Sequence, residues 1–494
     1  MMEFEVSKSA AKEGGFAWAF SLIGAIVRYA NNIILARVLG AYSFGLYAIA
    51  NTIVTVTSIV SSLGFPTSIV HFVAKEKERG DYSSLLWFVD KTKKITFFVS
   101  VFIVIIFILF TPYLSQKIYN KEGLKLPLYG LILSLPFLAL YNVRSSVLQG
   151  LRKIRKRVFI ERIAHPLIFS ILLLFAVFLK AKMEYVLISF FVSAVFVYIL
   201  TEYWNKGELG ILGCNDLSQQ KSYKELFSFS IPILFLNFLS FFILQSDILV
   251  MGYFRDPKEV GIYAIASRLA LGVGMPADSL GASLAPLYSA FTERKDKLGL
   301  SNLYKTSTRW IFIISSYVSI ILIFGSTLIL SLFGKDFRNG VLPLSILTLG
   351  QLFSASFGTN GTLITQTGHP KINMLNSIFI GTFNVLLLFF LVPKYGIIGA
   401  SLSSAISLII LNIVRSIEIE FILKISPWNK TILKPLFSLI VTALFGFFIF
   451  SYSTVLSLIL SLTLITSLLF ILGFEKEDRD LIERALQKVK LKNG

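Results

Sequence analysis

The sequence predicts an all-α polytopic membrane protein built from two pseudo-symmetric six-helix lobes and two C-terminal helices. Three observations lead to this fold class. Hydrophobic residues make up 55% of the 494 residues and charged residues only 15%, whereas a soluble chain carries about 25% charged residues. Apolar runs of roughly 20 residues, the length needed to cross a bilayer, recur along the whole chain. Short motifs also recur at a constant spacing, which indicates an internal repeat.

The composition excludes several classes of protein. The single cysteine, Cys214, rules out a disulfide framework and a cysteine-based zinc site. The three histidines are His71, His165 and His369, and their wide separation gives no indication of a metal centre. No Walker A motif is present, so ATP hydrolysis is not expected. We expect neither a nucleic-acid-binding domain nor an enzyme. The net charge of +19 is assigned first to the cytoplasmic loops of a membrane protein.

About fourteen spans follow from the apolar runs and the charged or Gly/Pro clusters between them. Their expected limits are 15–36, 43–73, 95–113, 126–150, 158–179, 184–204, 226–252, 259–291, 309–333, 341–366, 372–392, 397–423, 435–452 and 455–473. The last pair is the clearest, because residues 436–474 contain no charged residue. As one helix they would extend about 58 Å, nearly twice the ~30 Å hydrocarbon core. The chain must therefore fold back, with Ser451–Thr454 as the expected turn.

The distribution of Lys and Arg predicts the orientation. If the N-terminus is cytoplasmic, 31 of the 47 Lys and Arg residues fall in inner segments and 11 in outer ones. Such an excess marks the cytoplasmic side. We therefore expect both termini of a multi-pass protein of the cytoplasmic membrane to face the cytoplasm.

An internal repeat divides the chain. Gly45–Ala50 reads Gly-Leu-Tyr-Ala-Ile-Ala and returns as Gly-Ile-Tyr-Ala-Ile-Ala at Gly261–Ala266, an offset of 216 residues. Leu126–Leu128 returns at Leu342–Leu344 with the same offset. The expected segments are a cytoplasmic N-terminal segment 1–14, a first lobe 15–204, a cytoplasmic linker 205–225, a second lobe 226–423, two additional spans 424–474 and a cytoplasmic basic tail 475–494. Two parallel six-span lobes are a common transporter design, although architecture alone names no substrate.

Five segments carry a resemblance to a known family. Ile34–Gly40 and Phe44–Tyr47 resemble the opening signature of polysaccharide biosynthesis proteins, and Asp247–Gly252 with Glu259–Tyr263 resembles its echo in the second half. Lys394–Ala400 is similar to a late segment of the same family. The family is the O-antigen-type flippase group of the multidrug/oligosaccharidyl-lipid/polysaccharide exporter superfamily. The resemblance implies alternating-access transport of a polyprenyl-diphosphate-linked oligosaccharide from the inner to the outer leaflet, for the assembly of cell-surface polysaccharide.

Arginines within the expected spans are the candidate substrate-binding residues. A buried arginine costs about 2.5–3.5 kcal/mol at the centre of a membrane helix, and a diphosphate can offset this cost because guanidinium forks match phosphate oxygens. We expect Arg28 and Arg268 to bind the diphosphate, with Arg144 as a third candidate. A buried ion pair is the alternative for Arg28. For Arg162 we expect an ion pair with Glu161, and for Arg415 ion pairs with Glu418 and Glu420.

Other polar residues in the spans have weaker assignments. Asp247 and Asp278 are candidates for binding a coupling ion, Na⁺ or H⁺, or for balancing an arginine. No cofactor or metal is expected. Amide side chains are candidates for hydrogen bonds to sugar, or for contacts between helices; they are Asn31, Asn32, Asn237, Gln245, Asn360 and Gln366.

Other functional classes stay open. A cation-coupled multidrug or small-solute exporter of the same fold would have a small acidic cleft, whereas a lipid flippase would have a basic cleft. An integral glycosyltransferase is a weaker alternative, because the loops are short. A third is a non-transporting membrane partner of glycan-assembly enzymes. For the flippase we expect a monomer whose partners are the lipid-linked oligosaccharide and membrane lipids.

Overall fold

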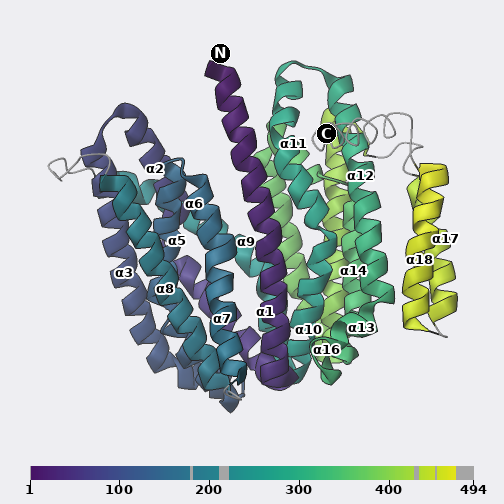
Figure 1. Cartoon of the computed structure of the whole chain (residues 1–494), viewed down its shortest axis with the longest axis horizontal. Helices are drawn as coiled ribbons and strands as arrows, with labels where there is room; N and C mark the ends of the chain where they lie inside the picture. The colour runs from purple at the N-terminus through teal and green to yellow at the C-terminus, as the bar shows by residue number, and fades with distance from the viewer. Residues whose placement is uncertain (1, 179–181, 211–221, 428–432, 451–452, 474–494) are drawn as a thin grey trace, which may run out of the picture. The chain divides into compact units, whose positions relative to one another are not determined.

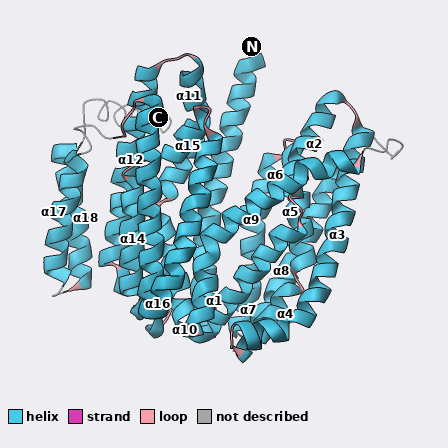
Figure 2. Ribbon diagram, turned by 180° about the vertical axis from the view of Figure 1, so that it is seen from behind, coloured by secondary structure: helices cyan, strands magenta, loops and turns pink. Residues whose placement is uncertain are grey.

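The computed structural model describes residues 2–178, 182–210, 222–427, 433–450 and 453–473. Within these ranges the chain is helical and contains no strand (Figure 2). It divides into two compact units, residues 1–261 and 262–494. The expected linker residues 211–221 and the basic tail 475–494 lie outside the described residues.

The first unit contains nine helices and the start of a tenth among its described residues (Figure 1). They are α1 (Met2–Ser61), α2 (Phe65–Arg79), α3 (Tyr82–Tyr113), α4 (Lys125–Ile132), α5 (Leu135–Gly150), α6 (Ile154–Phe159), α7 (His165–Phe178), α8 (Met183–Gly210), α9 (Tyr223–Phe254) and the start of α10 (Pro257–Ala270). A π-helical turn, Ile160–Ala164, joins α6 to α7. The core includes Phe72 and Phe88, whose stacked rings join α2 to α3 with their centroids 4.3 Å apart.

The second unit contains the remaining helices. They are α11 (Met275–Glu293), α12 (Lys297–Phe324), α13 (Ser326–Ser331), α14 (Val341–Ala355), α15 (Asn360–Gln366), α16 (Pro370–Leu423), α17 (Leu433–Phe450) and α18 (Thr454–Leu468). Helices α12, α14 and α16 pack in succession, and α17 and α18 form a hairpin that contacts α12. The expected fold-back of the last apolar segment is therefore present, and residues 451–452 of its expected turn lie outside the described residues.

Two long helices break where the sequence predicts a change of span. Within α1, Gly40 has φ 70° and ψ 170°, and within α16, Gly396 has φ 57° and ψ −131°. Positive φ is accessible to glycine without a steric penalty, so these residues permit the break. The described chain has ten helices that are long and apolar enough to cross a membrane, or up to twelve if each of two bent pairs forms one span. The count of fourteen stays a prediction.

The exposed surface of the spans is apolar. Leu109 on α3, Phe178 on α7 and Phe421 on α16 are 77%, 84% and 81% exposed. Exposure of many large apolar side chains is unfavourable in water and is typical of a surface that faces lipid. Together with the apolar helices, this surface makes the chain a multi-pass membrane protein. The helix α9, expected as the first span of the second lobe, packs against α1 and α2. The limits of the two lobes stay a prediction.

A glycine crossing holds α1 against the start of α10. A Cβ atom on Gly45 would lie 1.7 Å from the carbonyl oxygen of Pro257, and one on Gly261 would lie 2.2 Å from the carbonyl oxygen of Ala41. These distances leave no room for a side chain. Gly45 and Gly261 also occupy the same position in the two sequence repeats, so the repeat conserves the residue that each backbone needs for close approach.

We predict that Gly45→Ala destabilises the protein, because the added methyl group meets backbone and not a flexible side chain. Overpacking of this kind typically costs about 1–3 kcal/mol. The measurement is the thermal midpoint of the purified protein in detergent, which should fall by several degrees. Gly207→Ala is the matched control, because no atom lies within 4 Å of its Cβ position; its midpoint should be unchanged or higher. Equal midpoints for Gly45→Ala and the wild type would contradict the packing role.

Candidate functional site: an arginine pair and two pockets

Arg28 lies on the face of α1 that packs against the turn Ile160–Ala164 and α7. One turn before it, a Cβ atom on Gly24 would lie 2.0 Å from the carbonyl oxygen of Arg162. One turn after it, the Asn31 amide donates to the carbonyl of Pro166 at 2.9 Å and accepts from the Ser170 hydroxyl at 2.6 Å. The contacts on either side therefore fix Arg28 beside the helix that carries Arg162.

Arg28 and Arg162 form a pair of like charges. Arg28 is half-buried and Arg162 is exposed, and the two guanidinium groups lie near enough to interact electrostatically. In the part of the chain that the structure describes, neither side chain forms an ion pair or a hydrogen bond. Two neighbouring cations without an acid repel each other and lower the affinity for a further cation. We call Arg28 and Arg162 the arginine pair.

The expected ion pair between Arg162 and Glu161 is wrong. Glu161 instead accepts from the Arg157 Nε at 2.7 Å and from the Ser145 hydroxyl at 3.2 Å. Residues four apart share one helix face whereas sequence neighbours do not, so Arg157 is the better-placed partner. Sequence reasoning did not identify Arg162 as a site residue. The i,i+4 spacing of Arg157 and Glu161 is the signal that indicates Arg162 lacks this carboxylate as its partner.

The remaining arginines have different surroundings. Arg144 is 3% exposed and its Nε lies 2.7 Å from Oε2 of Glu202, which also binds the Lys93 ammonium at 2.7 Å. Arg144 is thus committed to an intramolecular ion triad. Arg268 is half-buried near the end of α10, in the second unit, and its role stays a prediction.

The expected ion pairs of Arg415 are also wrong within the described residues. Arg415 donates to the Ser377 hydroxyl at 3.3 Å, and Glu418 accepts from the Asn376 amide. The guanidinium lies against Gly361, where a Cβ atom would be 3.1 Å from Nη1. Its direct contacts are therefore a hydrogen bond and a glycine contact, and Glu418 interacts with it electrostatically without forming an ion pair.

The acidic candidates are separated. Asp247, on α9 in the first unit, is 7% exposed and accepts from the backbone amide of Ile248 at 2.8 Å. Asp278, in the first turn of α11 in the second unit, is exposed. Their assignment to ion coupling stays a prediction.

Most amide candidates are tied to neighbouring helices. Asn31 bridges α1 to α7 as described above. Asn360 is 2% exposed and donates to Oδ1 of Asn412 at 2.9 Å, and Gln366 accepts from the Ser289 hydroxyl at 2.8 Å. Asn32 and Gln245 are half-buried. For Asn31, Asn360 and Gln366 these contacts favour the role of joining helices.

A polar pocket lies in the first unit. It has a volume of about 380 Å³ and is lined by the turn between α1 and α2 and by parts of α5, α6, the turn Ile160–Ala164 and α9. Its polar lining residues include Asn142, Ser146, Arg157, Glu161 and Asn237. We refer to it as the polar pocket.

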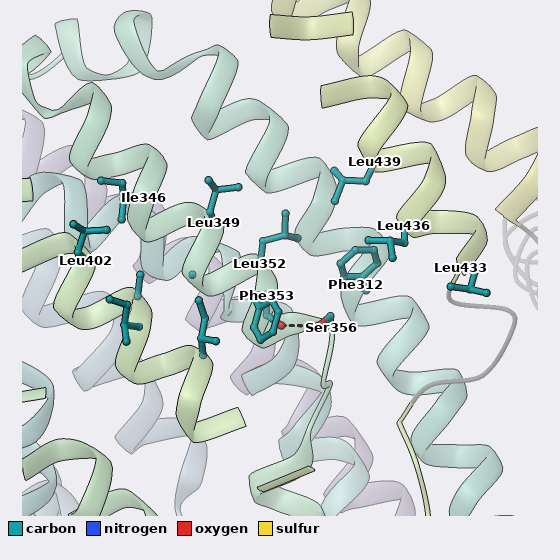
Figure 3. A pocket seen from close by; sticks show the side chains of 14 residues that line it. Phe312, Ile346, Leu349, Leu352, Phe353, Ser356, Leu402, Leu433, Leu436 and Leu439 are labelled. Atoms are coloured by element: carbon teal, nitrogen blue, oxygen red, sulfur yellow. Dashed lines mark hydrogen bonds between the residues drawn. The ribbon is translucent and has the colours of Figure 1, made fainter. Parts of the chain in front are cut away.

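An apolar cavity lies in the second unit (Figure 3). It has a volume of about 920 Å³ and is lined by residues of α12, α14, α16 and α17. In Figure 3, Leu436 and Leu439 of α17 face Phe312 and Leu352. Ser356 has the one polar side chain among the described lining residues, and its hydroxyl donates to the carbonyl of Phe353 at 2.6 Å. We refer to it as the apolar cavity.

The sequence matches the models of two protein families. The family described as polysaccharide biosynthesis protein matches residues 11–292, and the MatE family matches residues 232–390. The putative O-antigen transporter of Shigella flexneri is 24% identical over 382 residues, which cover 76% of this chain and 89% of that protein. The capsular polysaccharide biosynthesis protein CapF of Staphylococcus aureus is 26% identical over 243 residues, which cover 49% of this chain and 61% of that protein.

Two solved structures share the fold. One is the inward-facing conformation of a multidrug resistance MATE family transporter of the MOP superfamily, with a TM-score of 0.70 at 12% identity, covering 83% of this chain and 98% of that one. The other is the lipid II flippase MurJ in an inward closed conformation, with a TM-score of 0.69 at 18% identity, covering 94% of this chain and 99% of that one. The first family model spans more than half of the sequence, so the chain belongs to the polysaccharide biosynthesis protein family.

Proposed function

We propose that this protein is a flippase that carries a polyprenyl-diphosphate-linked oligosaccharide across the cytoplasmic membrane by alternating access, for the assembly of surface polysaccharide. The observation that carries the proposal is the arginine pair. Two guanidinium groups on membrane-spanning segments lie near enough to interact electrostatically and lack an acidic partner among the described residues. Family membership supports the same function. The proposal makes the protein a transporter and not an enzyme, and it requires no cofactor.

The arginine pair suits a diphosphate in charge and in hydrogen-bonding capacity. A diphosphate that links a lipid to a sugar carries one negative charge on each phosphate, and these match the two positive charges of the pair. Guanidinium groups bind phosphate oxygens through two parallel hydrogen bonds. A bound diphosphate would therefore remove the repulsion between Arg28 and Arg162 and offset the cost of placing them in a membrane.

The apolar cavity suits the polyprenyl tail. Among the described residues its lining offers no free hydrogen-bonding side chain, so an apolar ligand matches it best. Leu349, Phe353 and Ile406 line it and are 54%, 38% and 37% exposed, so it is open enough to admit a chain from the surrounding lipid. Its volume falls in the range of about 300–1,000 Å³ that is usual for ligand pockets.

In this proposal both termini face the cytoplasm and the protein acts as a monomer. Asp247 and Asp278 are its candidate coupling-ion residues. The cation-coupled exporter of the same fold is the second candidate function. The match to the MatE model and the likeness to a MATE transporter favour it.

We predict that Arg28→Ala and Arg162→Ala each slow lipid flipping about 10- to 100-fold, because a charge-assisted hydrogen bond to phosphate contributes about 1.5–3 kcal/mol. The assay uses vesicles with a labelled lipid-linked oligosaccharide in the inner leaflet and an external glycosidase that cleaves it after flipping. Arg28→Lys should retain part of the rate, since lysine keeps the positive charge but cannot form the two parallel hydrogen bonds of a guanidinium group.

Arg152→Ala is the matched control, because Arg152 is an exposed arginine that pairs with Glu78 at the surface, where ion pairs contribute little. It should flip at the wild-type rate. Wild-type rates for both Arg28→Ala and Arg162→Ala would contradict the assignment. Export of organic cations by vesicles that flip no lipid would establish the second candidate instead.

We also predict that Leu349→Trp, which fills part of the apolar cavity, slows the flipping of a C55 polyprenyl substrate more than that of a C10 substrate. The longer tail needs more of the cavity. Leu386→Trp is the control, since Leu386 is an exposed leucine of α16 outside the cavity. An equal effect of Leu349→Trp on both chain lengths would exclude the cavity as the site of the tail.

A further inference from the structure

The polar pocket contains side chains that the contacts within the fold do not explain. Asn142, Asn237 and Ser240 line it and are exposed. Among the described residues, none of these three side chains makes a hydrogen bond. Asn237 and Ser240 lie on a membrane-spanning segment, Tyr223–Phe241, where an unsatisfied polar group in contact with lipid is costly. Their place in a pocket relieves this cost only if water or a polar ligand fills it.

The charge of the pocket is balanced. Its two ionisable lining residues, Arg157 and Glu161, bind each other at 2.7 Å. The Ser145 hydroxyl holds the same carboxylate at 3.2 Å. A cation or an anion would have to displace one member of this ion pair, which disfavours both classes of ligand. The pocket therefore favours a neutral polar ligand.

The donors and acceptors of the pocket match a polyhydroxylated ligand. Asn142 and Asn237 each offer a carbonyl oxygen and an amide nitrogen, and Ser240 adds a hydroxyl. A sugar hydroxyl also both donates and accepts, so each of these groups can bind it in either sense. Phe241 and Pro66 supply apolar lining, which suits the C–H face of a pyranose ring. A volume of about 380 Å³ lies within the usual range for ligand pockets.

The polar pocket is joined to the arginine pair through one turn of the chain. Glu161 lines the pocket, and its neighbour Arg162 belongs to the pair. Both lie in the π-helical turn Ile160–Ala164, and their Cα atoms are about 3.8 Å apart. π-helical turns inside longer helices occur frequently at functional sites. Sequence neighbours point from different faces of a helix, so a ligand whose anionic group rests on Arg162 would reach the pocket with the groups that follow it around this turn.

We propose that the polar pocket binds the sugar unit nearest the diphosphate, with Asn142, Asn237 and Ser240 as its hydrogen-bonding residues and the Arg157–Glu161 ion pair as part of its wall. This inference rests on the proposed function, because the diphosphate on the arginine pair brings the sugar to the pocket. It adds a recognition site for saccharide that is separate from the sites for the headgroup and the tail.

The test compares the binding of two lipids to the purified full-length protein. One is the polyprenyl-diphosphate-linked oligosaccharide extracted from membranes of the source organism, and the other is the polyprenyl diphosphate that is left after its saccharide is removed. The wild type should bind the first at least fivefold more tightly. Asn142→Leu and Asn237→Leu should lose this preference and bind the bare diphosphate with wild-type affinity. Arg28→Ala should weaken the binding of both lipids.

Gln149→Leu is the matched control. Gln149 is an exposed amide on α5, the helix that carries Asn142, and it lies outside the polar pocket. This variant should retain the wild-type preference. A second readout uses Ser240→Cys in a Cys214→Ser background, where the sugar-bearing lipid should slow labelling by a thiol reagent and the bare diphosphate should not.

The outcomes separate this inference from the proposed function. A wild type that binds both lipids with equal affinity, or leucine variants that keep the wild-type preference or lose both lipids equally, would overturn the saccharide pocket and leave the flippase in place. A wild type that binds neither lipid would overturn both. Labelling of Ser240→Cys that neither lipid slows would also overturn the pocket.

Discussion

The positive charge of Arg28 and Arg162 is the constraint on which the functional account depends. Like charges that interact electrostatically on membrane-spanning helices raise the energy of the protein unless an anion or water reaches them. The fold keeps them together by contacts that do not involve the guanidinium groups, since Gly24 admits the backbone of Arg162 and Asn31 binds α7 on the other side of Arg28. The arrangement is therefore built before any ligand arrives, which reduces the cost of organising a binding site.

The three candidate ligand sites differ in chemistry in a way that matches the parts of a lipid-linked oligosaccharide. The arginine pair is cationic, the polar pocket is neutral and contains two amides, and the described lining of the apolar cavity has no free polar side chain. The first two lie in the first unit and the third in the second unit. A diphosphate, a sugar and an isoprenoid tail match these three environments. A small organic cation does not, because the arginine pair would repel it.

The sequence predicted the fold well because apolar runs and glycine residues determine helices and helix breaks within short stretches of the chain. Apolar runs marked the helices, and the breaks at Gly40 and Gly396 fell between expected spans. The number of spans was not established in the same way, because a bent helix such as the pair α4 and α5 differs from two helices only through tertiary packing. The sequence repeat also could not show that Gly45 and Gly261, its equivalent glycines, lie at one helix crossing.

The site was predicted less completely, because ion pairing depends on side-chain direction and on distant residues. Arg28 was identified from its depth in an apolar run, but Arg162 was assigned to its neighbour Glu161 although that carboxylate turns to Arg157. The partner of Arg144 is Glu202, 58 residues away, and no local pattern reveals it. The polar pocket draws on several segments from Ile59 to Phe241, so it exists only in the folded chain.

The most direct test of the central claim is a solid-state NMR measurement of the distance between arginine guanidinium carbons and the phosphorus atoms of bound polyprenyl diphosphate. Hydrogen-bonded guanidinium and phosphate groups place these atoms about 4 Å apart. The account predicts such a contact in the wild type and its loss when both Arg28 and Arg162 are replaced by lysine. A contact that persists in that double variant, or a bound lipid with no arginine near its phosphates, would contradict the account.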